Sequence, residues 1–116
     1  MTLDEVRRLL SCDVICGEEL LGVEIMECFA ADLMSDVLAF CKPDALLITG
    51  LTGVQSIHTT DLADLRGIVF VHRKRPSDQV LGLAREKRIP VLSTPLHMFD
   101  ACGILYGRGL RGGTKA

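Results

Sequence analysis

The chain of 116 residues lacks the features that mark several broad protein classes. Its formal net charge is only -2, so no overall field favours nucleic acid or an anionic membrane. No apolar run approaches the ~18 residues that a membrane-spanning helix needs, and the first residues lack the layout of a secretory signal. We therefore expect one cytoplasmic domain that binds neither nucleic acid nor membrane.

The five cysteines include no Cys-x-x-Cys pair, and their number is odd. This argues against a disulfide framework and against a zinc knuckle. Cys12 and Cys16 flank a short apolar stretch, and residues four apart in a regular strand share one face. A metal pair is one interpretation, and small buried hydrophobic residues are the simpler one. His58 and His97 lie in separate segments without metal-ligand spacing, so we expect neither a metal nor a cofactor.

Aromatic residues are scarce, at 4% of the chain, whereas apolar residues make up 48%. A small core does not hide that much aliphatic surface, so part of it is expected to pack against a second copy, as a dimer or higher oligomer. The alternative is a sheet that helices cover on both faces, whose strands are apolar throughout. Candidates for the contact lie within 20–41, namely Leu20, Leu21, Ile25, Met26, Leu33, Met34 and Phe40.

Three short apolar runs, at 45–48, 67–71 and 89–93, predict buried strands. Each run is followed by a segment in which apolar residues have helical spacing. This alternation is typical of a parallel sheet covered by helices. We therefore predict an α/β fold, a three-layer α/β/α sandwich with a mainly parallel central sheet in which these three strands are neighbours.

The rest of the chain completes this domain. The capping box Thr2-x-x-Glu5 opens a first helix, and Ser77 is the expected N-cap of a later one. Further elements are expected at 13–16 (strand), 20–29 (strand) and 32–41 (helix, with Asp32 as N-cap). Residues 107–116 contain four glycines and three basic residues, which predicts a mobile tail after a domain of residues 1–106.

Four stretches match a known pattern: Asp32-Leu-Met-Ser-Asp-Val, Leu46-Leu-Ile-Thr-Gly, Gly67-Ile-Val-Phe-Val and Ile89-Pro-Val-Leu-Ser-Thr-Pro. With the residues after them, they resemble the DRTGG domain family, especially its short stand-alone members. These members are similar to the N-terminal domain of HPr kinase/phosphorylase. The resemblance runs from Leu3 to Tyr106. It implies a three-layer α/β/α domain that serves as a regulatory element without known catalysis of its own.

The chain departs from the family at the signature that gives the family its name. The expected Asp-Arg falls near Thr52-Gly53, and the expected Thr-Gly-Gly falls near His72-Arg73-Lys74. None of the five signature letters is present. The resemblance therefore carries the fold, and it carries no ligand over to this chain.

Two loops that follow predicted strands hold the candidate ligand-binding residues, because ligands of parallel sheets lie at the carboxyl ends of the strands. Glycines let helix N–H groups approach a phosphate, and hydroxyl and guanidinium groups add donors. A small anionic ligand, a nucleotide or a phosphorylated compound, would then lie between the loops. The alternatives are a tight turn with glycine at positive φ and a solvated basic loop. The candidates are Thr49, Gly50, Thr52, Gly53, Ser56, His72, Arg73, Lys74 and Arg75.

Catalysis finds little support in the sequence. Asp32 and Asp36, four apart on a predicted helix, could act as paired carboxylates of a small phosphohydrolase or transferase. There is no P-loop and no nucleophile elbow. The sequence therefore favours a non-catalytic regulatory or interaction module that binds a small anion, a partner protein or both, with the enzyme as the alternative.

Overall fold

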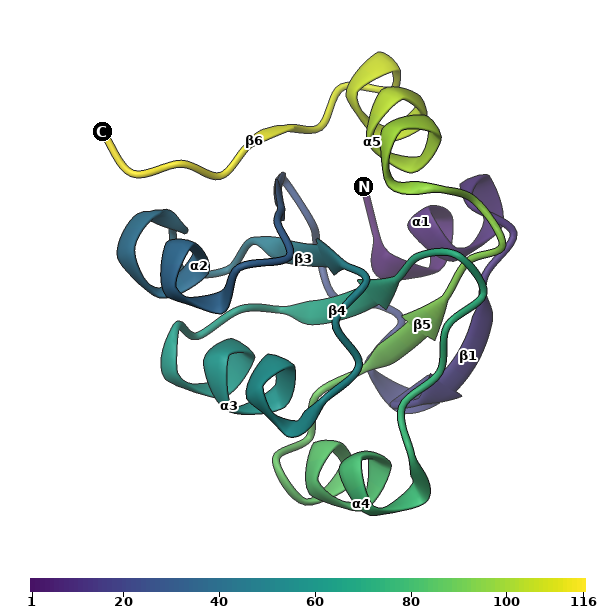
Figure 1. Ribbon diagram of the computed structural model, residues 1–116. Helices are drawn as coiled ribbons and strands as arrows, with labels where there is room; N and C mark the ends of the chain where they lie inside the picture. Colours follow the sequence, from purple (N-terminus) through teal and green to yellow (C-terminus); the bar gives the residue numbers. More distant parts are fainter.

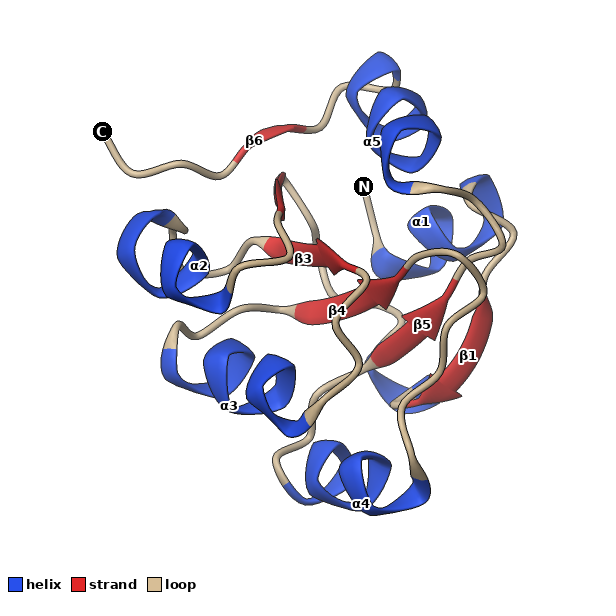
Figure 2. Cartoon of the chain, in the orientation of Figure 1, coloured by secondary structure: helices blue, strands red, loops and turns tan.

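The computed structural model describes all residues, 1–116, as helices and strands joined by short loops (Figures 1 and 2). The strands are β1 (Asp13–Cys16), β2 (Glu27–Ala30), β3 (Leu46–Thr49), β4 (Gly67–Phe70), β5 (Val91–Ser93) and β6 (Arg111–Gly112). The α-helices are α1 (Leu3–Leu9), α2 (Met34–Phe40), α3 (Val54–Leu62), α4 (Asp78–Glu86) and α5 (Met98–Gly107), and Glu18–Leu20 forms a 3-10 turn. None of these helices combines the length and the apolar character that crossing a membrane requires.

The six strands form one sheet in the order β1-β5-β4-β3-β2-β6. Strands β3, β4 and β5 are parallel neighbours, which confirms the prediction made from the three apolar runs. Only β1 runs antiparallel to its neighbour, β5. Every residue of β3, β4 and β5 is buried, so these strands have no solvated face and need no polar residue at alternate positions.

Two hydrophobic cores lie on the two faces of the sheet, and this confirms the three-layer α/β/α sandwich. Leu46 and Ile48 face the core under α1 and α5, whereas Leu47 between them faces the core under α2, α3 and α4. The alternation follows from the two-residue period of a strand. Figure 1 shows α1 and α5 on one side of the sheet and the other three helices on the opposite side.

Cys12, which precedes β1, and Cys16, at the end of β1, do not share a face of the sheet. Cys12 packs in the core under α1 and α5, and Cys16 packs in the opposite core. The pairing of β1 with β5 shifts register between Val14 and Cys16, and such a bulge breaks the simple alternation along the strand. The prediction that Cys12 and Cys16 share a face, on which a metal pair would depend, is therefore wrong.

The segment 20–41 is less regular than predicted. Only Glu27–Ala30 forms a strand, and helix α2 begins at Met34 with Leu33 as its N-cap, so Asp32 is not the cap. Ile25 is fully buried in the core of its own chain. Ile25, one of the residues predicted to contact a second copy, is therefore unavailable for such a contact.

The C-terminal residues differ from the predicted mobile tail. Strand β6 pairs in parallel with β2, and the amide N–H of Gly113 donates to the Cys28 carbonyl at 2.8 Å. Leu110 is buried in the core under α1 and α5. The glycines weaken the local tendency to form a strand, but the open edge of β2 offers backbone partners that local composition does not reveal.

Hydrogen exchange tests the placement of this C-terminal segment. We expect protected amides at Gly113 and Lys115, which donate to the carbonyls of Cys28 and Phe40, and faster exchange at Thr114, whose N–H has no backbone partner. Residue-resolved exchange measured by NMR checks this pattern. Uniformly fast exchange across 110–116 would contradict it.

Thiol reactivity tests the burial of the cysteines. Burial raises the pKa of Cys12 and of Cys28 to about 12 and that of Cys41 to about 11. Because the thiolate is the reacting species, these thiols should react with a disulfide reagent at pH 8 at least about a hundredfold more slowly in the folded chain than in denaturant. Prompt reaction of any of the three in the native protein would show that its burial is wrong.

Candidate functional site

The two loops singled out in the sequence meet at the carboxyl-end edge of the sheet. One loop follows β3 and the other follows β4, and the two strands are parallel neighbours. The ammonium group of Lys74 donates a hydrogen bond to the Gly50 carbonyl at 3.2 Å. The predicted convergence of the two loops is therefore present, and Lys74 is the side chain that joins them.

Asp32 holds the first of these loops in place, a role that the sequence did not reveal. Its Oδ1 atom accepts from the Gly50 amide at 2.8 Å and from the Thr49 hydroxyl at 3.0 Å. Asp32 follows β2, which is the next strand along the sheet, so the sheet order brings it to the loop. This contact depends on which strands are neighbours in the sheet, and local sequence spacing does not specify that order.

The two glycines of the loop do not have positive φ. Gly53 has φ -74° and ψ 172° and is the N-cap residue of α3. A Cβ atom on Gly50 would lie 3.4 Å from Lys74 Nζ and 3.6 Å from Asp32 Oδ1. These are ordinary van der Waals distances, so neither positive φ nor crowding by the two charged groups requires glycine at this position.

The hydroxyl groups of the loop have different roles. Thr49 is buried, and its hydroxyl also accepts from the Leu51 amide at 3.2 Å. Ser56 is fully buried and donates to the Leu51 carbonyl, so both hydroxyls shape the loop from inside. Thr52 is half-buried, and no side chain caps the first N–H groups of α3. Thr52 and the start of α3 are therefore the polar groups that remain for a ligand.

The loop after β4 is a tight turn with an unusual backbone. His72 and Arg73 have φ values of 60° and 58°, and the Lys74 amide donates to the Val71 carbonyl at 3.2 Å. Two consecutive non-glycine residues in this region cost about 1–3 kcal/mol each. The neighbouring 94–96 segment fixes the turn, because the amides of His72 and Arg73 donate to the carbonyls of Leu96 and Thr94.

The four basic side chains of this turn are not equally available. The Arg75 guanidinium is paired with Asp13 at 2.8 Å, and the His72 ring stacks on the His97 ring with centroids 3.8 Å apart. Lys74 uses one of its three donors on Gly50. The exposed Arg73 side chain has neither an ion pair nor a hydrogen bond in the structure, so it is the free cation of the turn.

The other candidates do not assemble into a reactive centre. Asp36 lies exposed on α2, and the Asp32 carboxylate is engaged with the 49–50 backbone and hydroxyl. No three His, Cys, Asp or Glu side chains are grouped as metal ligands. No pocket is lined by residues 72–75, so a ligand held by the two loops would lie on an open surface.

The fold is similar to that of a crystal structure of the CBS and DRTGG domains from the regulatory region of a Clostridium perfringens pyrophosphatase, complexed with the activator diadenosine tetraphosphate. The TM-score is 0.70 at 18% sequence identity, over 90% of this chain and 45% of the other. This chain therefore spans less than half of that structure, and the likeness shows the fold alone. No curated protein sequence matches the chain.

The sequence profile of the DRTGG domain matches residues 5–106, which include β1 to β5 and nearly all of the five helices. The matched region also contains both loops of the candidate site. The resemblance noted from the short motifs is thus confirmed, and the chain belongs to the DRTGG domain family.

Proposed function

We propose that this chain is a non-catalytic regulatory module that binds a small anionic ligand, a nucleotide or a phosphorylated metabolite, between loop 50–56 and loop 72–75. The observation that carries the proposal is the hydrogen bond from Lys74 to the Gly50 carbonyl, because it fixes a cationic turn against the start of a helix. The ligand would be recognised by its charge and would need no acid, base or nucleophile.

The available donors suit a phosphate group. Arg73 supplies a free guanidinium, and the uncapped N–H groups at the start of α3 lie at the positive end of the helix dipole. Lys74 keeps two donors beyond its bond to Gly50. Each hydrogen bond to a charged group of this kind contributes about 1.5–3 kcal/mol.

The backbone of the 72–75 turn gives independent support. Strained residues persist where the surroundings fix them and often where a side chain has a function. The family's Thr-Gly-Gly falls near this turn, and glycine adopts positive φ without strain. This chain has His72 and Arg73 instead, at φ 60° and 58°. Retaining two bulky polar side chains in such a turn favours a role for them in binding.

The comparison with the pyrophosphatase structure supports a regulatory role of the same kind. That structure contains a regulatory region with a DRTGG domain, and it is complexed with a nucleotide activator. The alternative of a phosphohydrolase or transferase has no comparable support, because Asp32 is engaged with the loop and Asp36 is exposed on α2.

Replacing Arg73 tests the anion site. Arg73→Ala should weaken the binding of diadenosine tetraphosphate or ATP about tenfold or more, since it removes a charge-assisted hydrogen bond. Arg85→Ala is the matched control, because Arg85 is also exposed but lies on α4, and it should leave the affinity unchanged. Calorimetric titration of both variants at two salt concentrations measures the effect, and added salt should weaken binding to the unaltered chain.

A loss of affinity shared equally by both variants would indicate nonspecific attraction to positive charge. Affinity that survives Arg73→Ala would place the ligand at another site. Binding of neither compound, with inorganic pyrophosphate also inactive, would contradict the proposed class of ligand.

Replacing Asp32 separates its structural role from its charge. Asp32→Ala leaves the buried Gly50 amide without its acceptor and should cost about 1–3 kcal/mol of unfolding free energy. Asp32→Asn keeps an oxygen acceptor, so it should lose less stability, and it removes a negative charge, so anion affinity should rise. Urea unfolding and titration with ATP check the two effects. Equal stability of the Ala variant and the unaltered chain would show that this contact does not hold the loop.

A further inference from the structure

Helix α5 has an apolar surface that the monomer does not cover. Its ten residues include one charged side chain, Asp100. Ala101 and Leu105 are buried against the sheet, yet Phe99 is 88% exposed and Tyr106 is 64% exposed. A helix that is apolar on nearly all sides is typical of one that is covered on nearly all sides. The outer face of α5 is therefore a candidate interaction surface.

The exposed residues lie along one stripe. Phe99 and Tyr106 are seven residues apart, which places them two turns apart on the same side of the helix. Gly103 lies between them, and a Cβ atom there would meet nothing within 4 Å. The stripe thus has an aromatic ring at each end. Its centre, Gly103, has no side chain, so a second helix can approach closely there.

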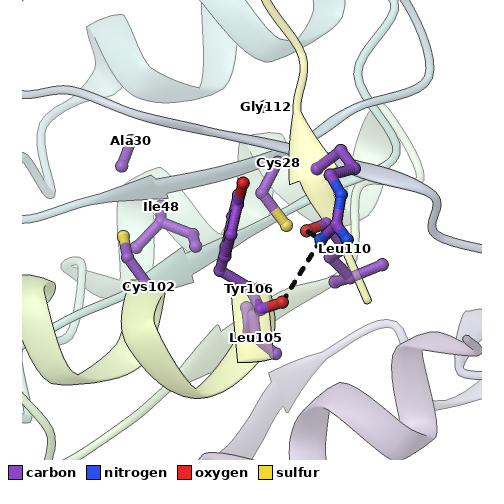
Figure 3. Close-up of a pocket in the computed structure, with 9 residues that line it drawn as sticks. Cys28, Ala30, Ile48, Cys102, Leu105, Tyr106, Leu110 and Gly112 are labelled. Carbon is purple, nitrogen blue, oxygen red and sulfur yellow. Dashed lines mark hydrogen bonds between the residues drawn. The ribbon is translucent and has the colours of Figure 1, made fainter. Parts of the chain in front are cut away.

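A pocket opens beside the Tyr106 end of this stripe (Figure 3). Its volume is about 140 Å³, and most of its lining is apolar. The lining includes Cys28, Ile48, Cys102, Leu105, Tyr106 and Leu110. An apolar cavity of about 150 Å³ accommodates a benzene ring. The pocket therefore has the size and the character to receive a phenyl side chain.

The wall of the pocket is held in a fixed position. The Arg111 guanidinium carbon lies 4.7 Å from the centre of the Tyr106 ring, and the same guanidinium donates to the Tyr106 carbonyl at 3.3 Å and to the Leu110 carbonyl at 3.0 Å. Figure 3 shows the Tyr106 ring between the Cys28 and Cys102 side chains. The pocket is therefore formed before anything enters it, which lowers the entropic cost of binding.

We propose that α5 packs antiparallel against α5 of a second copy, about a two-fold axis near Gly103. Phe99 of each chain enters the pocket beside Tyr106 of the partner subunit. The surface is self-complementary, as a two-fold interface requires, because the same helix carries the ring and the pocket that receives it. The dimer is independent of the proposed anion site.

Sedimentation analysis from low micromolar to near-millimolar concentration tests the dimer. The unaltered chain should exceed its monomer mass of 12.7 kDa as concentration rises. Phe99→Glu should give monomers at every concentration, whereas Leu62→Glu, which alters another well-exposed apolar residue on α3, should still dimerise. Circular dichroism confirms that both variants are folded. A monomeric unaltered chain, or a dimer that Leu62→Glu abolishes and Phe99→Glu leaves intact, would overturn the proposal.

Discussion

Strands β3, β4 and β5 are covered by helices on both faces, and this two-sided burial is the constraint on which the other features of the molecule depend. The three strands have no solvent-exposed residue, so their polar chemistry is confined to the loops at their ends. The parallel arrangement gathers the carboxyl ends of neighbouring strands at one edge. The loop residues of a short chain are thereby concentrated in one place without a dedicated cleft.

Several charges at this edge determine the shape of the loops before any ligand is present. Asp32 binds the Gly50 amide, Lys74 binds the Gly50 carbonyl, and both charged groups lie beside the bare Cα of that glycine. Arg75 is similarly engaged with Asp13 on the antiparallel strand. The basic cluster is therefore mostly structural, and Arg73 is the member whose side chain has no partner in the structure.

The two helical layers are covered to different extents. Helices α2, α3 and α4 pack beside one another on one face, whereas α1 and α5 cover the other face together with the C-terminal residues. Leu110 and strand β6 extend this second core toward the edge of β2. The outer side of α5, with Phe99 and Tyr106, stays exposed.

The features that the sequence determined by itself are those that depend on neighbours along the chain. The buried strands follow from uninterrupted apolar runs, the capping box at Thr2 from a three-residue spacing, and the cap at Ser77 from its place before a helix. Each of these preferences is local in its physical origin. A short motif therefore contains the information that specifies it.

Only the tertiary structure decided the features that depend on residues far apart in sequence. The bulge in β1 moved Cys12 and Cys16 into opposite cores, since register is set by the pairing with β5. The sheet order gave Asp32 its role, and the open edge of β2 gave the glycine-rich C-terminus a strand. Local preference is weak at all these positions, so long-range backbone pairing and burial outweighed it.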